Sequence, residues 1–254
     1  MRSNLRSVIA LCLAITGTCA LAQTKIPAYN TYLTAPFSTG ENTGLAADLV
    51  EYLNGKLKGK YVITLKNVPR ERLNQVILAS PDFKGIVLFA NPIFFGDVEK
   101  QKYFWTAAIM ADKNDVISLL SKKIEYSNPD SFKDKRFVGI RGHKYAGLEE
   151  RFGMDIKRID VYTESTLLKA IVLERADVTI MPASTYTYIM KKNGTEEGMM
   201  GKLYVSATPH LKFDRFMFVS YSDVALSKEL SSVAKEMGSD PAWKALLAKY
   251  GVAN

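Results

Sequence analysis

The sequence predicts an α/β fold built as two lobes. Apolar runs typical of buried strands alternate with amphipathic helical patterns along the whole chain, which indicates α/β packing. The alternation stops near Asn128-Pro129-Asp130 and then begins afresh, which indicates a second lobe. A chain of 254 residues is long enough for two lobes that each have a hydrophobic core.

The strands predicted before this break are short apolar runs. They cover residues 28–33, 61–65, 86–89 and 116–120. The run at 86–89 is apolar throughout, as expected for a strand that a parallel sheet buries on both faces.

Two helices are predicted between these strands. The first follows Thr43, a suitable N-cap residue, and its leucines recur at every fourth position from Leu45 to Leu57. The second begins at Pro69, because proline is well tolerated in the first turn of a helix, and its apolar side starts with Leu73.

The second series of strands and helices has the same character. Strand patterns cover residues 137–140, 159–162, 178–181, 203–205 and 216–221. Helical patterns end near Phe152, cover residues 164–175, carry Tyr186 and Ile189, and close the chain at 227–237 and 241–250. We therefore predict lobe one from residues 23–112 plus 213–254 and lobe two from residues 113–212, with crossings near 111–116 and 210–216.

Residues 1–22 have the pattern of a secretory signal peptide. Arg2 and Arg6 precede an apolar run at 8–15, and Ala20-Leu21-Ala22 fits the small-x-small cleavage rule, so Gln23 becomes the first mature residue. Export to the periplasm is expected. An uncleaved anchor, or a lipid on Cys19, is the alternative. Because Cys12 and Cys19 both lie in this segment, the mature chain has no cysteine for a disulfide or thiol catalysis.

The charge of the mature chain is moderately positive. Loss of Arg2 and Arg6 leaves 32 of the 34 Lys and Arg against 26 Asp and Glu, which lowers the net charge from +8 to +6. The lysines are scattered and form no basic stripe with aromatic residues, so no nucleic-acid partner is predicted. A mildly basic cleft attracts anionic solutes.

No motif for metal, cofactor or catalytic chemistry is present. The only histidines are His143 and His210, and no zinc-type ligand spacing occurs. The chain has neither a Gly-x-Ser-x-Gly turn nor a glycine-rich phosphate loop. We predict no cofactor, no metal and no enzyme.

Several segments resemble the bacterial extracellular solute-binding proteins of the polar amino-acid type, the type II periplasmic binding proteins. The resemblance covers the mature chain and rests on the order and spacing of segments that are individually weak. They are Ala35-Pro36-Phe37 with residues 44–49, residues 132–139, residues 168–171 with 175–178, residues 201–205, and residues 243–251.

The resemblance implies two α/β lobes, joined by two hinge strands, that close on a small solute and deliver it to an inner-membrane permease. A monomer is expected. Two alternatives stay open on the same fold: a sensor that presents its solute to a membrane receptor, and a dehydratase or lyase with His143 as general acid or base.

The usual anchors for a free amino acid are missing. The family's arginine for the ligand carboxylate would fall between Gly96 and Val98, and Pro182 occupies the place of the acid that pairs with the ammonium group. Thr34 and Arg70 occupy the places of two stacking aromatics. A standard amino acid bound in the usual way is therefore not expected.

Other residues near these places predict a different ligand. The turn at Arg141-Gly142-His143 offers backbone N–H groups to an anion, Asn91 supplies a donor and an acceptor, and Phe94 offers a stacking face. We expect an anionic solute with an apolar or aromatic part. The alternatives are a surface position for Arg70 and His143 and a core position for Phe94. The candidate ligand-binding residues are Thr34, Phe37, Arg70, Asn91, Phe94, Arg141, His143, Tyr145 and Tyr186.

Overall fold

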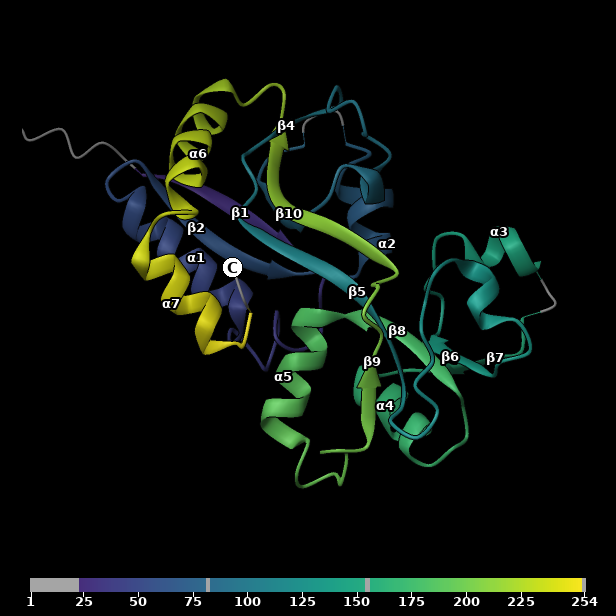
Figure 1. Cartoon of the computed structure of the whole chain (residues 1–254). Helices are drawn as coiled ribbons and strands as arrows, with labels where there is room; N and C mark the ends of the chain where they lie inside the picture. The colour runs from purple at the N-terminus through teal and green to yellow at the C-terminus, as the bar shows by residue number, and fades with distance from the viewer. Residues whose placement is uncertain (1–22, 81–82, 154–155, 253–254) are drawn as a thin grey trace, which may run out of the picture.

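A computed structural model describes residues 23–80, 83–153 and 156–252, and it contains two α/β lobes (Figure 1). Two long strands, β5 (Met110–Leu119) and β10 (Leu211–Ser220), extend from one lobe into the other. They pair antiparallel, with Leu211 opposite Asn114 and Arg215 opposite Met110. We call this pair of strands the ribbon.

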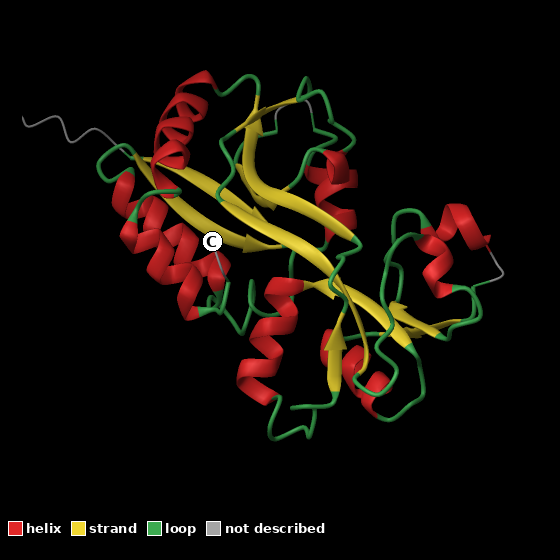
Figure 2. Cartoon of the chain, viewed as in Figure 1, coloured by secondary structure: helices red, strands yellow, loops and turns green. Residues whose placement is uncertain are grey.

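Lobe one is a sheet with helices on both faces. In the sheet β1 lies between its parallel neighbours β2 and β3, β10 pairs antiparallel with β3, and β4 pairs with β10. Helices α1, α6 and α7 lie together on one side of these strands and α2 lies on the other (Figure 2). The elements are β1 (Thr24–Asn30), α1 (Leu45–Lys56), β2 (Tyr61–Asn67), α2 (Arg70–Arg72), β3 (Ile86–Ala90), β4 (Tyr103–Trp105), α6 (Val224–Met237) and α7 (Pro241–Lys249).

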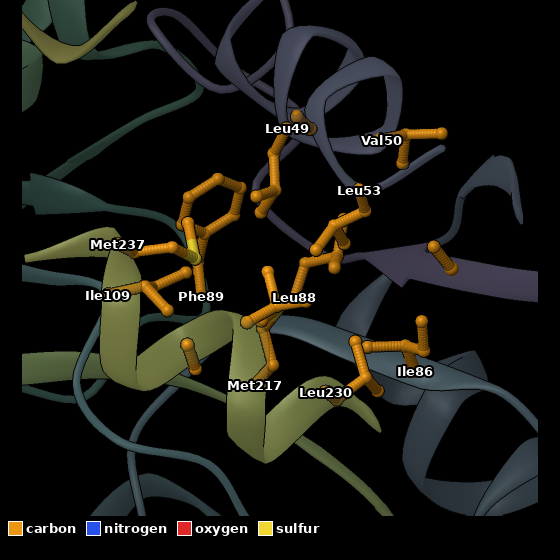
Figure 3. Packing of buried hydrophobic residues seen from close by; sticks show 14 of the residues in the cluster. Leu49, Val50, Leu53, Ile86, Leu88, Phe89, Ile109, Met217, Leu230 and Met237 are labelled. Carbon is orange, nitrogen blue, oxygen red and sulfur yellow. The ribbon is translucent and has the colours of Figure 1, made fainter. Parts of the chain in front are cut away.

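The main core of lobe one forms where α1 and α6 cover the sheet. Leu49 and Leu53 of α1 point toward Leu88 of β3 and Met217 of β10 (Figure 3). Leu49 and Leu53 are 0% exposed, so the every-fourth-residue leucine pattern marks a helix face that is removed from water. Burial of one such side chain contributes roughly 1.5–3 kcal/mol.

Lobe two is smaller and forms around β8. This strand pairs antiparallel with β5 and parallel with β6, β6 pairs parallel with β7, and β9 pairs with β5. Helix α4 contributes Leu167, Leu168 and Ile171 to its core. The elements are β6 (Phe137–Ile140), α3 (Leu148–Phe152), β7 (Arg158–Val161), α4 (Glu164–Val172), β8 (Val178–Pro182), α5 (Ala183–Asn193) and β9 (Leu203–Val205).

The predicted α/β class is confirmed, while several element boundaries differ from the prediction. The residue before α1 is Gly44 rather than Thr43, whose hydroxyl pairs with Thr39. The helix predicted at Pro69 is only one short turn, Arg70–Arg72, and continues as a π-helical turn over Leu73–Ile77. The predicted lobe boundaries fall inside β5 and β10 and stay a prediction.

No helix within residues 23–80, 83–153 and 156–252 is long and apolar enough to cross a membrane. The same residues contain no cluster of His, Cys, Asp and Glu suited to a metal ion. The predicted signal peptide, residues 1–22, lies outside the described residues.

Candidate ligand-binding cleft

A cavity of about 470 Å³ lies between the lobes, and both lobes and the ribbon line it. Most of its walls are aromatic or aliphatic. From lobe one come Tyr32, Thr34, Phe37 and Phe94. From lobe two come His143, Tyr145, Glu164, Pro182 and Thr185. From the ribbon come Asn114, Leu211, Phe213 and Arg215, with His210 directly before β10.

The alternation of side chains along β10 explains which ribbon residues reach this cleft. Leu211, Phe213 and Arg215 occupy every second position of the strand, so their side chains share one face. Asn114, opposite Leu211 on β5, faces the same way. The ribbon therefore presents an apolar surface to the cleft that ends in one arginine.

Arg215 is bound to Asp112 at the base of the cleft. Its Nε and Nη2 atoms donate to Asp112 Oδ2 at 2.9 and 2.8 Å, and the two side chains are only 1% and 2% exposed. The guanidinium carbon also lies 4.4 Å from the ring centre of Tyr32 and 4.6 Å from that of Phe37. Because Asp112 neutralises it, Arg215 forms a charged but paired floor of the cleft.

Asp112 also connects the ribbon to lobe two. It accepts hydrogen bonds from the hydroxyl of Ser184 at 2.7 Å and from the backbone N–H of Ser184 at 3.3 Å. Ser184 is in the first turn of α5, where free N–H groups and the helix dipole favour a carboxylate. One carboxylate therefore pairs with an arginine of the ribbon and with a helix end of lobe two.

The lobes also touch away from the ribbon. Thr34 Oγ1 donates to Glu164 Oε1 at 3.0 Å. The rings of Tyr188 on α5 and Tyr250 after α7 stack with their centres 6.1 Å apart. Both contacts join segments of different lobes, and Thr34 and Glu164 also line the cleft.

Comparison with known proteins gives a fold but no sequence family. No protein-family model matches the chain, and no curated protein matches its sequence. The chain is similar in structure to the probable amino-acid ABC transporter extracellular-binding protein ytmK from Bacillus subtilis, with a TM-score of 0.68 and 15% identity over 90% of this chain and 98% of that one.

Two further solved structures agree. The GluR0 ligand-binding core from Nostoc punctiforme, in complex with L-glutamate, has a TM-score of 0.63 and 14% identity, over 90% of this chain and 99% of that chain. The L-cystine solute receptor of Neisseria gonorrhoeae, in its unliganded open conformation, has a TM-score of 0.61 and 16% identity, over 91% of this chain and 94% of that chain. The chain has the two-lobed fold of the type II periplasmic binding proteins.

Within this fold, five of the predicted site residues line the cleft: Thr34, Phe37, Phe94, His143 and Tyr145. Phe37 is buried, with its ring 4.8 Å from that of Tyr32. Phe94 packs edge-on against Phe213 with ring centres 5.2 Å apart. The hydroxyl of Tyr145 accepts the N–H of Ile140 at 2.9 Å. These aromatic walls are held by neighbouring side chains and backbone.

Arg70 lies beside the cleft rather than in it. It lines a smaller cavity of about 220 Å³ that shares Phe94 with the cleft. Its guanidinium carbon lies 3.5 Å from the ring centre of Phe95, and its Nε donates to Asn74 at 3.1 Å. No carboxylate forms an ion pair with Arg70 within the described part of the chain, and burial lowers the pKa of its guanidinium.

Three other predicted residues lie outside the cleft. Asn91 is buried and donates to the backbone oxygen of Asp214 at 2.8 Å, so it positions the loop that carries Phe94. Arg141 is exposed and donates to the hydroxyl of Tyr162. Tyr186 lines a different cavity, on the other face of the ribbon.

Both histidines line the cleft. His210 Nε2 lies 2.8 Å from the carbonyl oxygen of Ala146, so this nitrogen carries the proton. Burial lowers the pKa of His210 and also that of His143, which nearby Glu164 partly raises again. The ring of His210, which is half-buried, is therefore favoured in its neutral form, whereas the His143 side chain is exposed.

Arg215, Asp112, Glu164 and His210 were not among the predicted site residues. A signal for two of them was present in the sequence. Asp112 and Arg215 carry opposite charges in the two segments predicted to cross between the lobes, and paired charges are expected where two strands are buried side by side. Glu164 was predicted only as the start of a helix.

Proposed function

We propose that this protein binds a small solute between its lobes, and that the solute has an anionic group and an apolar or aromatic part. The observation that carries the proposal is the cleft itself, a cavity of about 470 Å³ that both lobes and the ribbon line. A solute held there touches both lobes at once, so its binding energy stabilises the closed arrangement.

The cleft favours an apolar part because its walls are largely aromatic. Tyr32, Phe37, Phe94 and Tyr145 offer ring faces or edges. The acidic side chain that would pair with an ammonium group is absent, because Pro182 lines the cleft at its usual place. Arg215 is already paired with Asp112. These features support a solute other than a standard amino acid held in the usual way.

Arg70 is the residue we propose for the anionic group. It is a partly buried guanidinium without a carboxylate partner in the described residues, and it donates a hydrogen bond to the backbone oxygen of Phe94, which lines both its own cavity and the cleft. An anionic group bound there forms a charge-assisted hydrogen bond with the guanidinium, which has no carboxylate partner of its own among the described residues. The aromatic part of the same solute then packs on Phe94 from the cleft side.

We propose uptake as the biological role, with export to the periplasm, delivery to an inner-membrane ABC permease and action as a monomer. Similar structures include the substrate-binding protein of an amino acid ABC transporter and an arginine transport-system periplasmic binding protein from Legionella pneumophila. The similarity to the GluR0 ligand-binding core favours a sensor as the second candidate.

A thermal-shift screen of residues 23–254 tests the proposal. A solute at about 100 times its dissociation constant stabilises the protein by roughly 2.7 kcal/mol, which is easily measured. We expect shifts with aromatic or branched carboxylates. Arg70→Ala and Phe94→Ala then weaken binding at least tenfold, while Arg72→Ala, an exposed neighbour, leaves it unchanged. If the Arg70 and Phe94 variants both bind the solute as tightly as the natural protein does, the proposed site is wrong.

A further inference from the structure

A second cavity, of about 660 Å³, lies on the opposite face of the ribbon from the cleft. The alternation of side chains decides this placement. Leu211, Phe213 and Arg215 line the cleft, whereas Lys212 and Asp214 between them line this second cavity, which Asp112 and Phe213 also border. On β5, Lys113 lies opposite Lys212, and Asp115 follows two positions later on the same face of the strand. We call this second cavity the rear pocket.

The charges of the rear pocket form an ordered pattern. Lys113 and Lys212 lie directly opposite each other on the paired strands, where like charges repel. The ammonium group of Lys113 is held by Asp115 at 2.9 Å, and the Asp115 side chain is only 5% exposed. This buried partner fixes one of the two lysines in place.

Lys212 and Asp214 are left without such partners. Neither forms an ion pair within the described part of the chain, and both side chains are exposed. They are two residues apart on one strand face, a separation of roughly 7 Å. The rear pocket therefore offers a positive position, between Lys113 and Lys212, beside an unpaired carboxylate.

The remaining walls come from both lobes. Tyr186 and Thr187 of α5 line one side, and Gly251 and Val252 after α7 line the other. Gly251 has a φ of +75°, and a Cβ there would meet Thr187 at 3.0 Å, so the segment that follows α7 lies close to α5. Tyr186 is half-buried and gives the pocket an aromatic surface.

We propose that the rear pocket binds a small zwitterion of the free amino-acid class. Its carboxylate lies between Lys113 and Lys212, its ammonium group pairs with Asp214, and its side chain packs on Tyr186. Opposite charges on one short molecule match the opposite unpaired charges on β10. This site is separate from the cleft and needs neither Arg70 nor Phe94.

The position of the rear pocket couples it to the lobes. Because the ribbon separates the two cavities, a rotation that closes the lobes on one face opens them on the other. A zwitterion that contacts both Tyr186 on one side of the rear pocket and Val252 on the other holds these two walls together, and it therefore opposes closure of the cleft. This coupling, unlike the binding itself, rests on the proposed function.

Calorimetric titration of residues 23–254 with the standard amino acids tests the site. We expect at least one to bind, with affinity reduced tenfold or more by Lys212→Gln and by Asp214→Asn, and unchanged by Phe94→Ala or by the control Lys202→Ala. Its N-acetyl and carboxamide derivatives, which each lack one charge, should not bind. Far-ultraviolet circular dichroism of each variant establishes that it is folded.

The results separate this proposal from the proposed function. Absence of binding by every amino acid overturns the rear-pocket site and leaves the cleft proposal intact. Binding that Phe94→Ala abolishes and Lys212→Gln does not affect places the amino acid in the cleft, and overturns the rear-pocket proposal together with the solute class proposed for the cleft.

Discussion

Thr34 Oγ1 donates a hydrogen bond to Glu164 Oε1 at 3.0 Å, and so joins residues 130 positions apart that belong to different lobes. Both residues line the cleft as well. A rotation of the lobes away from each other breaks this contact. Thr34 therefore holds the lobes together at a distance from the ribbon.

Replacement of Thr34 by valine keeps the shape of the side chain and removes the donor. Loss of one hydrogen bond of this kind costs about 0.5–1 kcal/mol, so we expect solute affinity to fall roughly two- to fivefold. Small-angle X-ray scattering of the ligand-free variant should show a larger radius of gyration. Thr39→Val, which breaks a hydroxyl contact within lobe one, should leave both quantities unchanged.

Loss of the buried ion pair between Arg215 and Asp112 is expected to lower the folding stability by a larger amount. Asp112→Asn leaves an unpaired guanidinium that is only 1% exposed, and such a change costs about 3–5 kcal/mol of folding free energy. Urea unfolding measures this loss. The matched control is Asp130→Asn, which breaks an exposed pair with Arg151 and should cost less than about 1 kcal/mol. Equal losses in the two variants contradict the role assigned to burial.

Much of the fold could be predicted because its signals are local. The apolar run at 86–89 is found as β3, Ile86–Ala90, which is buried at every position. The every-fourth-residue leucines are the buried face of α1. Boundaries of the long strands were harder, because their ends depend on tertiary pairing. Only the apolar half of β10, predicted as residues 216–221, stands out from the sequence.

That missed half of β10 explains why Arg215 was not predicted as a site residue. A strand that begins at Leu211 places Phe213 and Arg215 on one face and Lys212 and Asp214 on the other. Without that start, the alternation of LKFDRF cannot be assigned to two surfaces. Thr34 and Phe37 could be predicted through the resemblance to solute-binding proteins. Phe37 belongs to the segment Ala35-Pro36-Phe37 that carries this resemblance, and Thr34 directly precedes it.

The ionised carboxylate of Asp177 makes the stability of the protein depend on pH in the acidic range. Its carboxylate accepts hydrogen bonds from Arg136 through the side chain and the backbone N–H, and from Lys122 at 2.8 Å. The Arg136 side chain first, and Lys122 next, hold the pKa of Asp177 far below its ordinary value of 3.8. A lowered pKa in the folded state gives stability that is present above the unfolded value and is lost as the carboxylate protonates.

We therefore expect the unfolding free energy to decline as the pH falls below about 4. Asp177→Asn should be less stable than the natural protein at pH 7, and the difference should shrink toward pH 2. Denaturant unfolding at a series of pH values measures both curves. A difference that stays constant from pH 7 to pH 2 shows that the ionised carboxylate is not the stabilising form.

Gly44 is a glycine that the first lobe cannot replace without strain. Its φ is +115°, and a Cβ built there lies 2.6 Å from the backbone oxygen of Phe37, a cleft residue. Gly44→Ala must therefore strain the backbone or displace the segment that carries Phe37, at a cost of roughly 1–3 kcal/mol. Thermal unfolding measures the loss, and a weaker solute affinity is expected because Phe37 moves.

The matched control for this change is Gly55, a glycine of α1 with no heavy atom within 4 Å of an added Cβ. Gly55→Ala should stabilise the protein by roughly 0.5–1 kcal/mol, because alanine loses less backbone entropy in a helix. Changes of opposite sign in the free energy of unfolding, at two glycines eleven residues apart, distinguish backbone strain from helix propensity. Stabilisation by both substitutions would show that the Phe37 segment yields without cost, and that the lobe-one wall of the cleft is not rigid.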